Sequence, residues 1–171
     1  MSVTDEKIEL MEEEYIAEDT QKDRYLSFKI ANEEYAIEIK HIIEIIGIQK
    51  ITKVPNIKNY IKGIISLRGV IIPVVEVRTR FNLSPIEYDE RTCIIVITYG
   101  NSDIGLIVDE VQEVVTINEN QIENPPITSK GTQGRFISGI GKVGSTVKLV
   151  LHIDKLLYDD NEMNETTEEE N

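Results

Sequence analysis

Residues 60–78 have the sequence YIKGIISLRGVIIPVVEVR, in which β-branched side chains are nearly continuous. This composition is typical of strands that are buried on both faces. One permanently charged side chain, Arg68, lies in the middle of the run beside Gly69. A guanidinium in apolar surroundings must be paired or must face a binding partner. Because Gly69 permits a tight turn that lifts Arg68 out of the core, the segment predicts a recognition arginine on a rigid β scaffold, with a structural ion pair as the alternative.

Strand and turn signals alternate along the chain on both sides of this segment. Isoleucine dominates the apolar residues and Trp is absent, which favours strands over a helical bundle. We expect strands at 25–30, 35–39 and 92–99, with turns at 31–34 and 100–103. Short strands joined by short turns are typical of small closed barrels, which have no exposed edges.

Two further segments are less regular. After Ile39 the apolar pattern fits either a helical turn or a bent strand. Asp154 is placed to cap a short terminal helix over 155–158.

The chain also contains an internal repeat. Residues 35–45 match residues 104–114 in pattern at an offset of 69, and residues 60–64 match residues 136–140. Fourteen residues after its glycine, each copy has an apolar residue that we expect to end a strand, namely Val77 or Ile153. Chance similarity between β-rich segments is the alternative. The shared order of both matches favours duplication and predicts two similar small barrels.

The net charge of −13 is concentrated at the two ends of the chain. Residues 1–24 hold nine acidic and three basic side chains, residues 154–171 hold eight and one, and the body between them holds fourteen of each. Such acidic ends are usually solvated and poorly ordered. The spacing of Ile8, Met11 and Tyr15 fits a short N-terminal helix that is barely stable alone in water. Acidic tails disfavour binding to nucleic acid and to anionic membrane surfaces.

Neither an export signal nor a membrane span is evident in the sequence. The N-terminus has no apolar signal region, and no run of about eighteen apolar residues occurs. The single cysteine, Cys93, cannot form an intramolecular disulfide, which fits a reducing cytoplasm. We therefore expect a cytoplasmic protein that does not insert into membranes.

The sequence gives little support to a catalytic or metal-binding site. The two histidines, His41 and His152, have no neighbouring cysteine and no second histidine at the spacing of metal ligands. Cys93 lies in an apolar strand, where we expect a small buried side chain rather than a nucleophile. We expect no catalytic residues, no cofactor and no metal.

Charged and glycine-rich segments are explained by exposed surface. Asp109, Glu110 and Glu113 fit solvent-facing positions better than an acid–base pair, and residues 139–144 lack the P-loop spacing and predict a hairpin. A basic cluster surrounds the Val54-Pro55 turn and consists of Lys50, Lys53, Lys58 and Lys62. This cluster lacks the interleaved aromatic residues of single-strand binders, apart from Tyr60, and suits an acidic partner surface better.

At residues 63–78 the chain resembles the CheW family of coupling proteins from bacterial chemotaxis. Gly63, the Leu67-Arg68-Gly69 turn and Pro73 carry the most specific part of the resemblance. The resemblance covers roughly residues 22–158. It includes Tyr25-Leu26-Ser27-Phe28, Glu34-Tyr35-Ala36-Ile37-Glu38-Ile39, Ile42-Ile43-Glu44-Ile45, Val54-Pro55, Gly105-Leu106-Ile107-Val108-Asp109, Phe136-Ile137-Ser138-Gly139-Ile140-Gly141 and the closing segment 149–157.

The resemblance implies a mostly β fold of two five-stranded SH3-like barrels packed side by side, with short helices and flexible acidic tails. It implies an acidic N-terminal tail over 1–21, a body over 22–158 made of two intertwined lobes that turn over near 82–92, and an acidic C-terminal tail over 159–171. Lys58 stands where the family often has a second proline, and Glu76 stands where aspartate is usual. Both changes are conservative for a turn and a strand end.

The same resemblance implies a non-enzymatic adaptor. It would couple transmembrane chemoreceptors to the histidine kinase CheA in ternary arrays, and it would be recruited from the cytoplasm to the membrane-associated receptors. One surface would bind the cytoplasmic tip of a methyl-accepting chemoreceptor, and another would bind the regulatory domain of CheA. The positions that match the family's receptor contacts are Ile42, Glu44, Gly63, Arg68, Ile71, Cys93, Gly105 and Val114.

Alternative functions remain open at this point. The length of 171 residues leaves no room for the extra domains of CheA or of the receiver fusion CheV. A coupling protein of another chemosensory pathway, such as pilus motility, has the same sequence features. A ligand-binding or catalytic β-barrel would need a pocket, and His41 or Asp109 would be the place to look for it.

Overall fold

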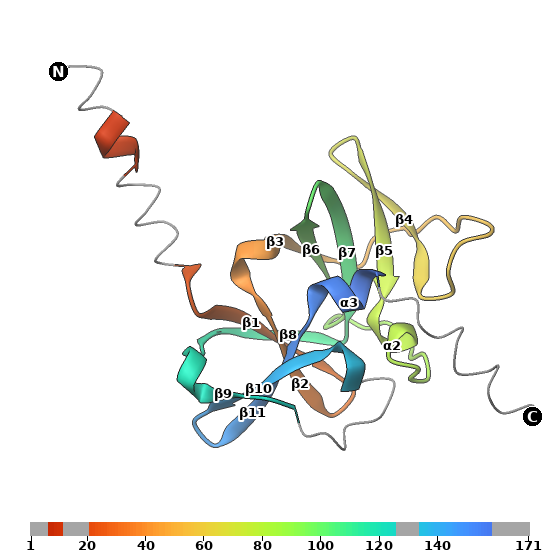
Figure 1. Cartoon of the computed structure of the whole chain (residues 1–171). Coiled ribbons are helices and arrows are strands. Elements are labelled where there is room, and N and C mark those ends of the chain that lie inside the picture. The colour runs from red at the N-terminus through yellow and green to blue at the C-terminus, as the bar shows by residue number, and fades with distance from the viewer. Residues whose placement is uncertain (1–6, 12–20, 126–133, 159–171) are drawn as a thin grey trace, which may run out of the picture.

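The computed structural model describes residues 7–11, 21–125 and 134–158, and strands form most of it (Figure 1). The strands are β1 (Arg24–Ile30), β2 (Glu33–Glu38), β3 (Ile42–Gly47), β4 (Ile61–Leu67), β5 (Val70–Glu76), β6 (Cys93–Tyr99), β7 (Ser102–Val108), β8 (Glu110–Thr116), β9 (Ile122–Glu123), β10 (Ile137–Val143) and β11 (Thr146–Leu151). The short helices are η1 (Ile39–His41), α2 (Val77–Arg80), η2 (Glu119–Gln121), η3 (Gly134–Phe136) and α3 (Ile153–Tyr158). The prediction of a mostly β fold is confirmed.

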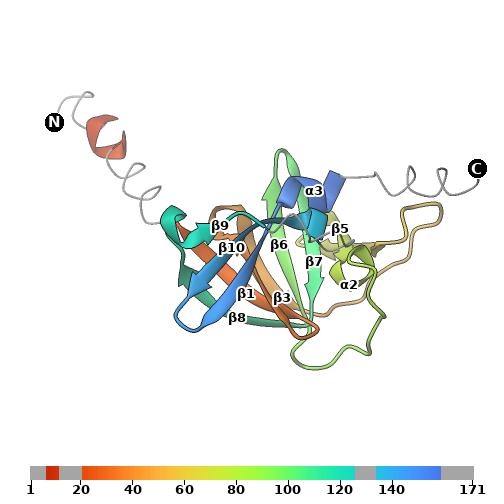
Figure 2. The same cartoon turned by 60° about the horizontal axis from the view of Figure 1, so that its bottom comes forward.

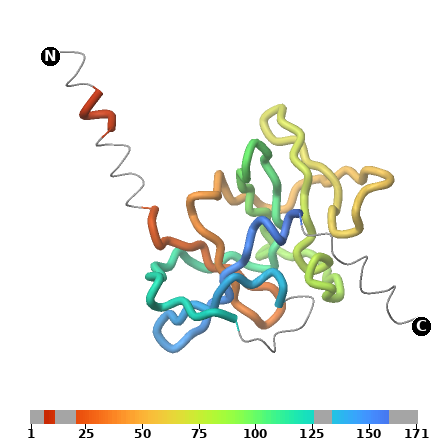
Figure 3. The backbone as a smooth tube through the Cα atoms, in the orientation of Figure 1, coloured from red at the N-terminus to blue at the C-terminus, as the bar shows by residue number. Residues whose placement is uncertain are grey.

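The strands form two sheets, and each sheet contains strands from both halves of the sequence. The six-stranded sheet has the order β8-β1-β2-β11-β10-β9, and the five-stranded sheet has the order β3-β6-β7-β5-β4. The N-terminal hairpin β1–β2 therefore lies beside the C-terminal strands, and the hairpin β6–β7 lies among the strands of the first half. Figure 3 shows the orange segment leaving the six-stranded sheet to enter the other one at β3. We call the five-stranded sheet with α2 the first lobe and the six-stranded sheet with α3 the second lobe.

The repeat predicted from the sequence corresponds to the two lobes. The hairpin β6–β7 occupies in the first lobe the place that β1–β2 occupies in the second, and each lobe contains one parallel pair, β5 with β7 or β11 with β2. The register shifts at Gly63 in β4 and at Gly139 in β10, the equivalent positions of the two copies. The lobes differ at one edge. In the second lobe β9 pairs with β10 as a sixth strand, whereas at the equivalent place the first lobe has only the isolated bridge between Thr52 and Ile64.

The ends of the repeats differ from the prediction. Val77 and Ile153 do not end strands but begin the short helices α2 and α3. Asp154 therefore lies inside the first turn of α3 instead of capping it, and the backbone N–H of Lys155 donates to Nδ1 of His152 at 3.4 Å. After Ile39 the chain forms first a 3-10 turn and then a strand, so both open alternatives occur in succession.

Three apolar clusters form the core. One fills the first lobe, around Val74, Ile94 and Ile107, and a smaller one fills the second lobe, around Tyr25 and Val150. The largest cluster is assembled from strands of both sheets and from α2 and α3. Because most of the buried apolar residues lie between the lobes, we expect the two lobes to unfold together rather than as separate domains.

Two arginines of α2 fasten the lobes to each other. Arg78 donates from Nε and Nη2 to the carboxylate of Asp109, with Nη2 at 2.7 Å from Oδ2, and the same oxygen accepts from the backbone N–H of Ala31 in the β1–β2 turn. The prediction that Asp109 faces solvent is therefore wrong, because its carboxylate joins α2 to the second lobe. Arg80 is only 1% exposed and donates from Nε to the carbonyl of Leu156 in α3 at 2.7 Å. Figure 2 shows α3 lying over β6 of the first lobe, where the hydroxyl of Tyr99 donates to Asp154.

The predicted acidic tails fall mostly outside the described part of the chain. Residues 159–171 are not described, and of the N-terminal tail only 7–11 and Gln21 are. Residues 7–11 form a helical turn with Ile8 and Met11 exposed, whereas Tyr15 lies outside the described residues. The division into tails at 21 and 159 and a turn-over near 82–92 stays a prediction.

The bulge glycine of the first lobe allows a sharp stability test. A Cβ on Gly63 would lie 2.3 Å from the backbone oxygen of Thr52, which is held by the bridge to Ile64. We expect Gly63→Ala to lower the free energy of unfolding by about 2 kcal/mol or more in urea denaturation, since backbone must move. Gly47→Ala on β3 is the matched control, because nothing lies within 4 Å of its added Cβ. Equal midpoints for the two variants would contradict the role of Gly63.

Candidate docking surface

The β4–β5 hairpin raises Arg68 above the first lobe. Leu67 pairs with Val70, so Arg68 and Gly69 form a two-residue turn, and their φ angles are +50° and +80°. Positive φ at both positions is the signature of the type I′ turn that suits the twist of a hairpin. Glycine adopts this conformation freely, whereas a side chain there costs about 1 kcal/mol. The prediction that Gly69 lifts Arg68 out of the core is confirmed.

The guanidinium of Arg68 is held by a carboxylate on another strand. Nη1 donates to Oε1 of Glu44, and Nη2 donates to Oε2 at 2.8 Å, which makes the pair bidentate. The side chain of Arg68 is 72% exposed and that of Glu44 is 22% exposed. Because β3 and β4 are the two edge strands of the five-stranded sheet, the ion pair joins its two ends while leaving much of the guanidinium open to a partner.

Exposed aliphatic side chains surround this ion pair in the sequence. Val70 and Ile71 follow the turn directly, and Ile71 is 62% exposed. On β3, Ile43 and Ile45 flank Glu44 in the sequence and are exposed, but side chains alternate along a strand, so they lie on the opposite face from Glu44. Exposed apolar side chains beside the Arg68 turn, as Val70 and Ile71 provide, are typical of a protein-binding surface.

The ion pair changes the acid–base behaviour of its carboxylate. The hydrogen bonds from Arg68 hold the pKa of Glu44 below its usual range. A depressed pKa means that the pair stabilises the fold above the ordinary carboxyl pKa, and that this contribution is lost as the pH falls through the lowered value.

This linkage predicts an NMR titration. In Arg68→Ala we expect the pKa of the Glu44 side chain to rise towards its ordinary value, measured from the carboxyl carbon shift. Asp89, whose pKa is lowered by hydrogen bonds from Arg91 at another site, serves as the internal control and is expected to titrate alike in both proteins. An identical Glu44 titration in both proteins would mean that the pair does not persist in solution.

The remaining predicted contact positions are spread over both lobes. Ile42 begins β3, two residues before Glu44, and Cys93 begins β6, where it pairs with Gly47 at the other end of β3. Val114 lies exposed on β8, the edge strand of the other sheet, and it corresponds in the repeat to Ile45 of β3. The structure joins Arg68 directly to Glu44 alone among these positions, and their role in receptor binding stays a prediction.

Two of the predicted positions are packing glycines. Gly63 passes the backbone of Thr52 closely, as described above. Gly105 lies in the central strand β7, where an added Cβ would lie 2.8 Å from Cγ2 of Ile94. Since neither has a side chain to offer, any influence of these glycines on binding acts through the shape of the sheet.

Cys93 differs from the sequence prediction. It is partly exposed rather than buried, and its thiol donates to the carbonyl of Arg91 at 3.3 Å. Partial burial raises the pKa of the Cys93 thiol, which keeps it protonated at neutral pH.

Sequence reasoning missed several features of this surface. It treated Arg68 and Glu44 as separate positions, because nothing in the sequence shows that these two residues, 24 positions apart, are paired. It also overlooked Ile43, Ile45 and Val70, because an exposed isoleucine has the same strand propensity as a buried one.

Two small clefts lie outside this surface. One contains Asp109 together with Lys29 and Arg91, and the other contains both histidines of the chain, His41 and His152. Among the described residues, no group of three or more histidine, cysteine or acidic side chains is arranged to hold a metal ion.

Comparison with known proteins gives one consistent family. A family model described as the CheW-like domain matches residues 24–161. The chemotaxis protein CheW of Klebsiella aerogenes is 34% identical over 142 residues, which cover 83% of this chain and 86% of that protein. The CheW protein of Bacillus subtilis is 40% identical over 104 residues, covering 61% of this chain and 67% of that protein.

A solved structure agrees with the sequence matches. The scaffolding protein TtCheW of Thermoanaerobacter tengcongensis superposes with a TM-score of 0.73 and 33% identity, covering 80% of this chain and 88% of that one. In the described segments, no helix has the length and apolar character needed to cross a membrane.

Proposed function

This chain belongs to the CheW family of chemotaxis scaffold proteins, and we propose that it couples transmembrane chemoreceptors to the histidine kinase CheA. A scaffold acts by presenting surfaces, and the name of the solved relative describes that role rather than an enzymatic one. In this proposal the protein is recruited from the cytoplasm to receptor arrays and forms ternary complexes with both partners.

The observation that carries the proposal is the exposed, bidentate pair of Arg68 and Glu44. The fold contributes an arginine that is fixed in direction by Glu44 and has free donor groups, because guanidinium has five N–H groups and the pair uses two. Fixing the side chain in advance lowers the entropy cost of binding. A receptor tip made of helices offers carbonyl and carboxylate acceptors that suit such a donor.

Two of the other predicted positions also present exposed side chains. Ile71 is exposed beside the turn, and Val114 is exposed on the other lobe. We propose that the contacts comprise these two residues with Ile42, Glu44 and Arg68, and that Gly63, Cys93 and Gly105 influence them by shaping the sheet. The regulatory domain of CheA would bind elsewhere on the two lobes.

The proposal is tested by reconstitution. Receptor-containing membrane vesicles, CheA and this protein are sedimented together, and the phosphorylation of CheA is measured with and without attractant. We expect this protein to bring CheA into the pellet and to make its activity respond to receptor. If CheA stays in the supernatant and its activity is indifferent to receptor, the chain does not couple these partners.

A pathway other than flagellar chemotaxis remains the second candidate. The family contains scaffolds of this size, and nothing in the described surface distinguishes one receptor class from another. Running the same sedimentation with receptors of each chemosensory pathway in the host separates the two candidates.

A further inference from the structure

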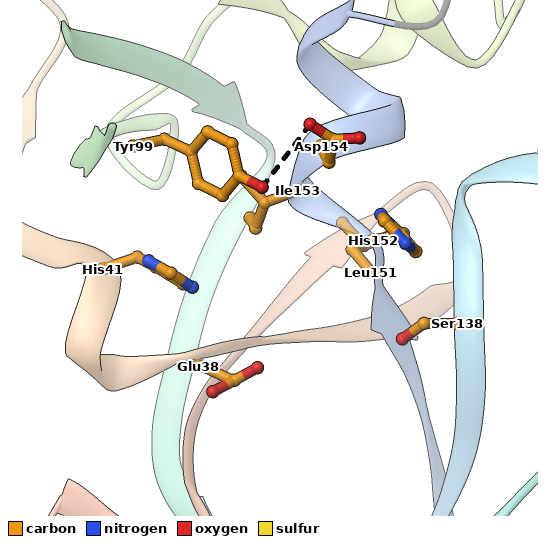
Figure 4. A pocket seen from close by; sticks show the side chains of 8 residues that line it. All are labelled: Glu38, His41, Tyr99, Ser138, Leu151, His152, Ile153 and Asp154. Carbon is orange, nitrogen blue, oxygen red and sulfur yellow. Dashed lines mark hydrogen bonds between the residues drawn. The ribbon is translucent and has the colours of Figure 1, made fainter. Parts of the chain in front are cut away.

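A cleft of about 270 Å³ lies where the two lobes meet, on residues that the coupling function does not use. Figure 4 shows His41 and Glu38 on one side of the opening, Ser138 and His152 on the other, and Tyr99 with Asp154 at its upper end. Leu151 and Ile153 contribute the apolar part of its lining. These residues are far apart in the sequence, and the exchange of hairpins between the lobes brings them together.

The cleft offers acceptors for a positive group. Glu38 and Asp154 supply carboxylates at its edge, and the hydroxyl of Tyr99 donates to Oδ1 of Asp154 at 3.4 Å. Burial lowers the pKa of His41, so its imidazole is neutral at neutral pH and does not repel a cation. Besides these residues, the charged group near His41 is Lys40, which pairs with Glu38 at 3.0 Å.

The rings of His41 and Tyr99 line the same end of the cleft. Their centroids are 5.6 Å apart, and Tyr158, which is outside the lining, packs behind Tyr99 with a centroid distance of 6.1 Å. Aromatic faces next to carboxylates are the chemistry by which proteins recognise guanidinium and alkylammonium groups. The volume is slightly below that of sites for drug-sized ligands, which favours a single small group.

We propose that this interlobe cleft binds one organic cation, a guanidinium or alkylammonium group that contacts Glu38, Asp154 and the rings of His41 and Tyr99. The group belongs either to an arginine or lysine of a partner protein or to a free small molecule. This inference goes beyond the coupling function and does not depend on it. The exposed pair of Lys40 and Glu38 is weak, and the incoming cation competes with Lys40 for the carboxylate.

The test is an NMR titration of the full chain with methylguanidinium chloride, with the neutral isostere N-methylurea as the control probe. We expect saturable shifts confined to residues around the cleft with methylguanidinium and none with the urea. Asp154→Asn and Glu38→Gln are expected to weaken binding about fivefold each, as for one charge contact near the surface. Lys40→Gln is expected to strengthen it about twofold by removing the competing ammonium.

Glu123→Gln is the matched control, because it removes a carboxylate from an exposed ion pair with Lys142 elsewhere in the second lobe. It is expected to leave the titration unchanged. The proposal is overturned if the shifts extend to acidic residues outside the cleft, or if Glu123→Gln weakens binding as much as Asp154→Asn does. Equal binding of N-methylurea also overturns it.

A second experiment decides whether the cation comes from a partner protein or from a free small molecule. A receptor fragment and a CheA fragment are added in turn to the complex with methylguanidinium. If one fragment reverses the chemical shifts of the cleft residues, a side chain of that partner is the occupant. If the shifts persist after both fragments have been added, the occupant is a free cation.

Discussion

Replacing Arg80 by alanine is expected to lower the free energy of unfolding by about 3–5 kcal/mol, as when one partner of a buried charged contact is removed. The guanidinium donates to the carbonyls of Leu156 and Lys155 at 2.7 and 3.1 Å. It also lies 4.0 Å from the ring centroid of Tyr60 and 4.8 Å from that of Phe136. The substitution therefore leaves two carbonyls of α3 without this donor and opens a cavity between the lobes.

Urea denaturation followed by circular dichroism measures this effect, with Arg91→Ala as the control. The side chain of Arg91 is exposed and pairs with its near neighbour Asp89, so removing it is expected to leave the denaturation midpoint almost unchanged. Arg80→Lys keeps the charge but not the planar fork, and it should fall between the two. A loss below about 1 kcal/mol for Arg80→Ala would show that α3 is held mainly by its apolar residues.

Arg68→Ala is expected to abolish coupling of CheA to receptor while leaving the midpoint of unfolding within a few degrees of the parent protein. The side chain is largely exposed, and an exposed ion pair contributes little to stability because solvent screens it. A central arginine in an interface, by contrast, often contributes about 2 kcal/mol or more to binding, which corresponds to a loss of about thirtyfold in affinity.

Two further variants separate binding by Arg68 from support of the sheet. Glu44→Gln keeps the arginine but weakens its hold, and the exchanged pair Arg68→Glu with Glu44→Arg keeps the ion pair but reverses its direction. If Arg68 contacts the receptor, the exchanged protein stays stable and fails to couple, and Glu44→Gln retains partial coupling. If the pair only supports the surface, the exchanged protein couples normally. Sedimentation with receptor vesicles and thermal unfolding are measured on the same samples.

Much of the fold could be predicted from the sequence because its determinants are local. The β-branched run at 60–78, the turn at Gly69 and the repeat at an offset of 69 each depend on neighbouring residues or on simple periodicity. The errors also follow from this. Val77 and Ile153 have strand propensity, but both begin short helices and are buried in the core cluster shared by the two lobes, where tertiary packing overrides local propensity.

The sequence by itself determined that the chain is a repeated β fold with Arg68 on a turn, and the family resemblance added its place among scaffold proteins. Only the tertiary structure decided which charged side chains pair with each other and which of them are buried. Lys148 is 3% exposed and pairs with Glu34 inside the second lobe, Arg80 is buried between the lobes, and Arg68 meets Glu44 from another strand. Each of these contacts joins residues that are distant in the sequence. The neighbours of a charged residue in the sequence do not show which residue will pair with it, because that depends on how the strands of the two lobes are arranged.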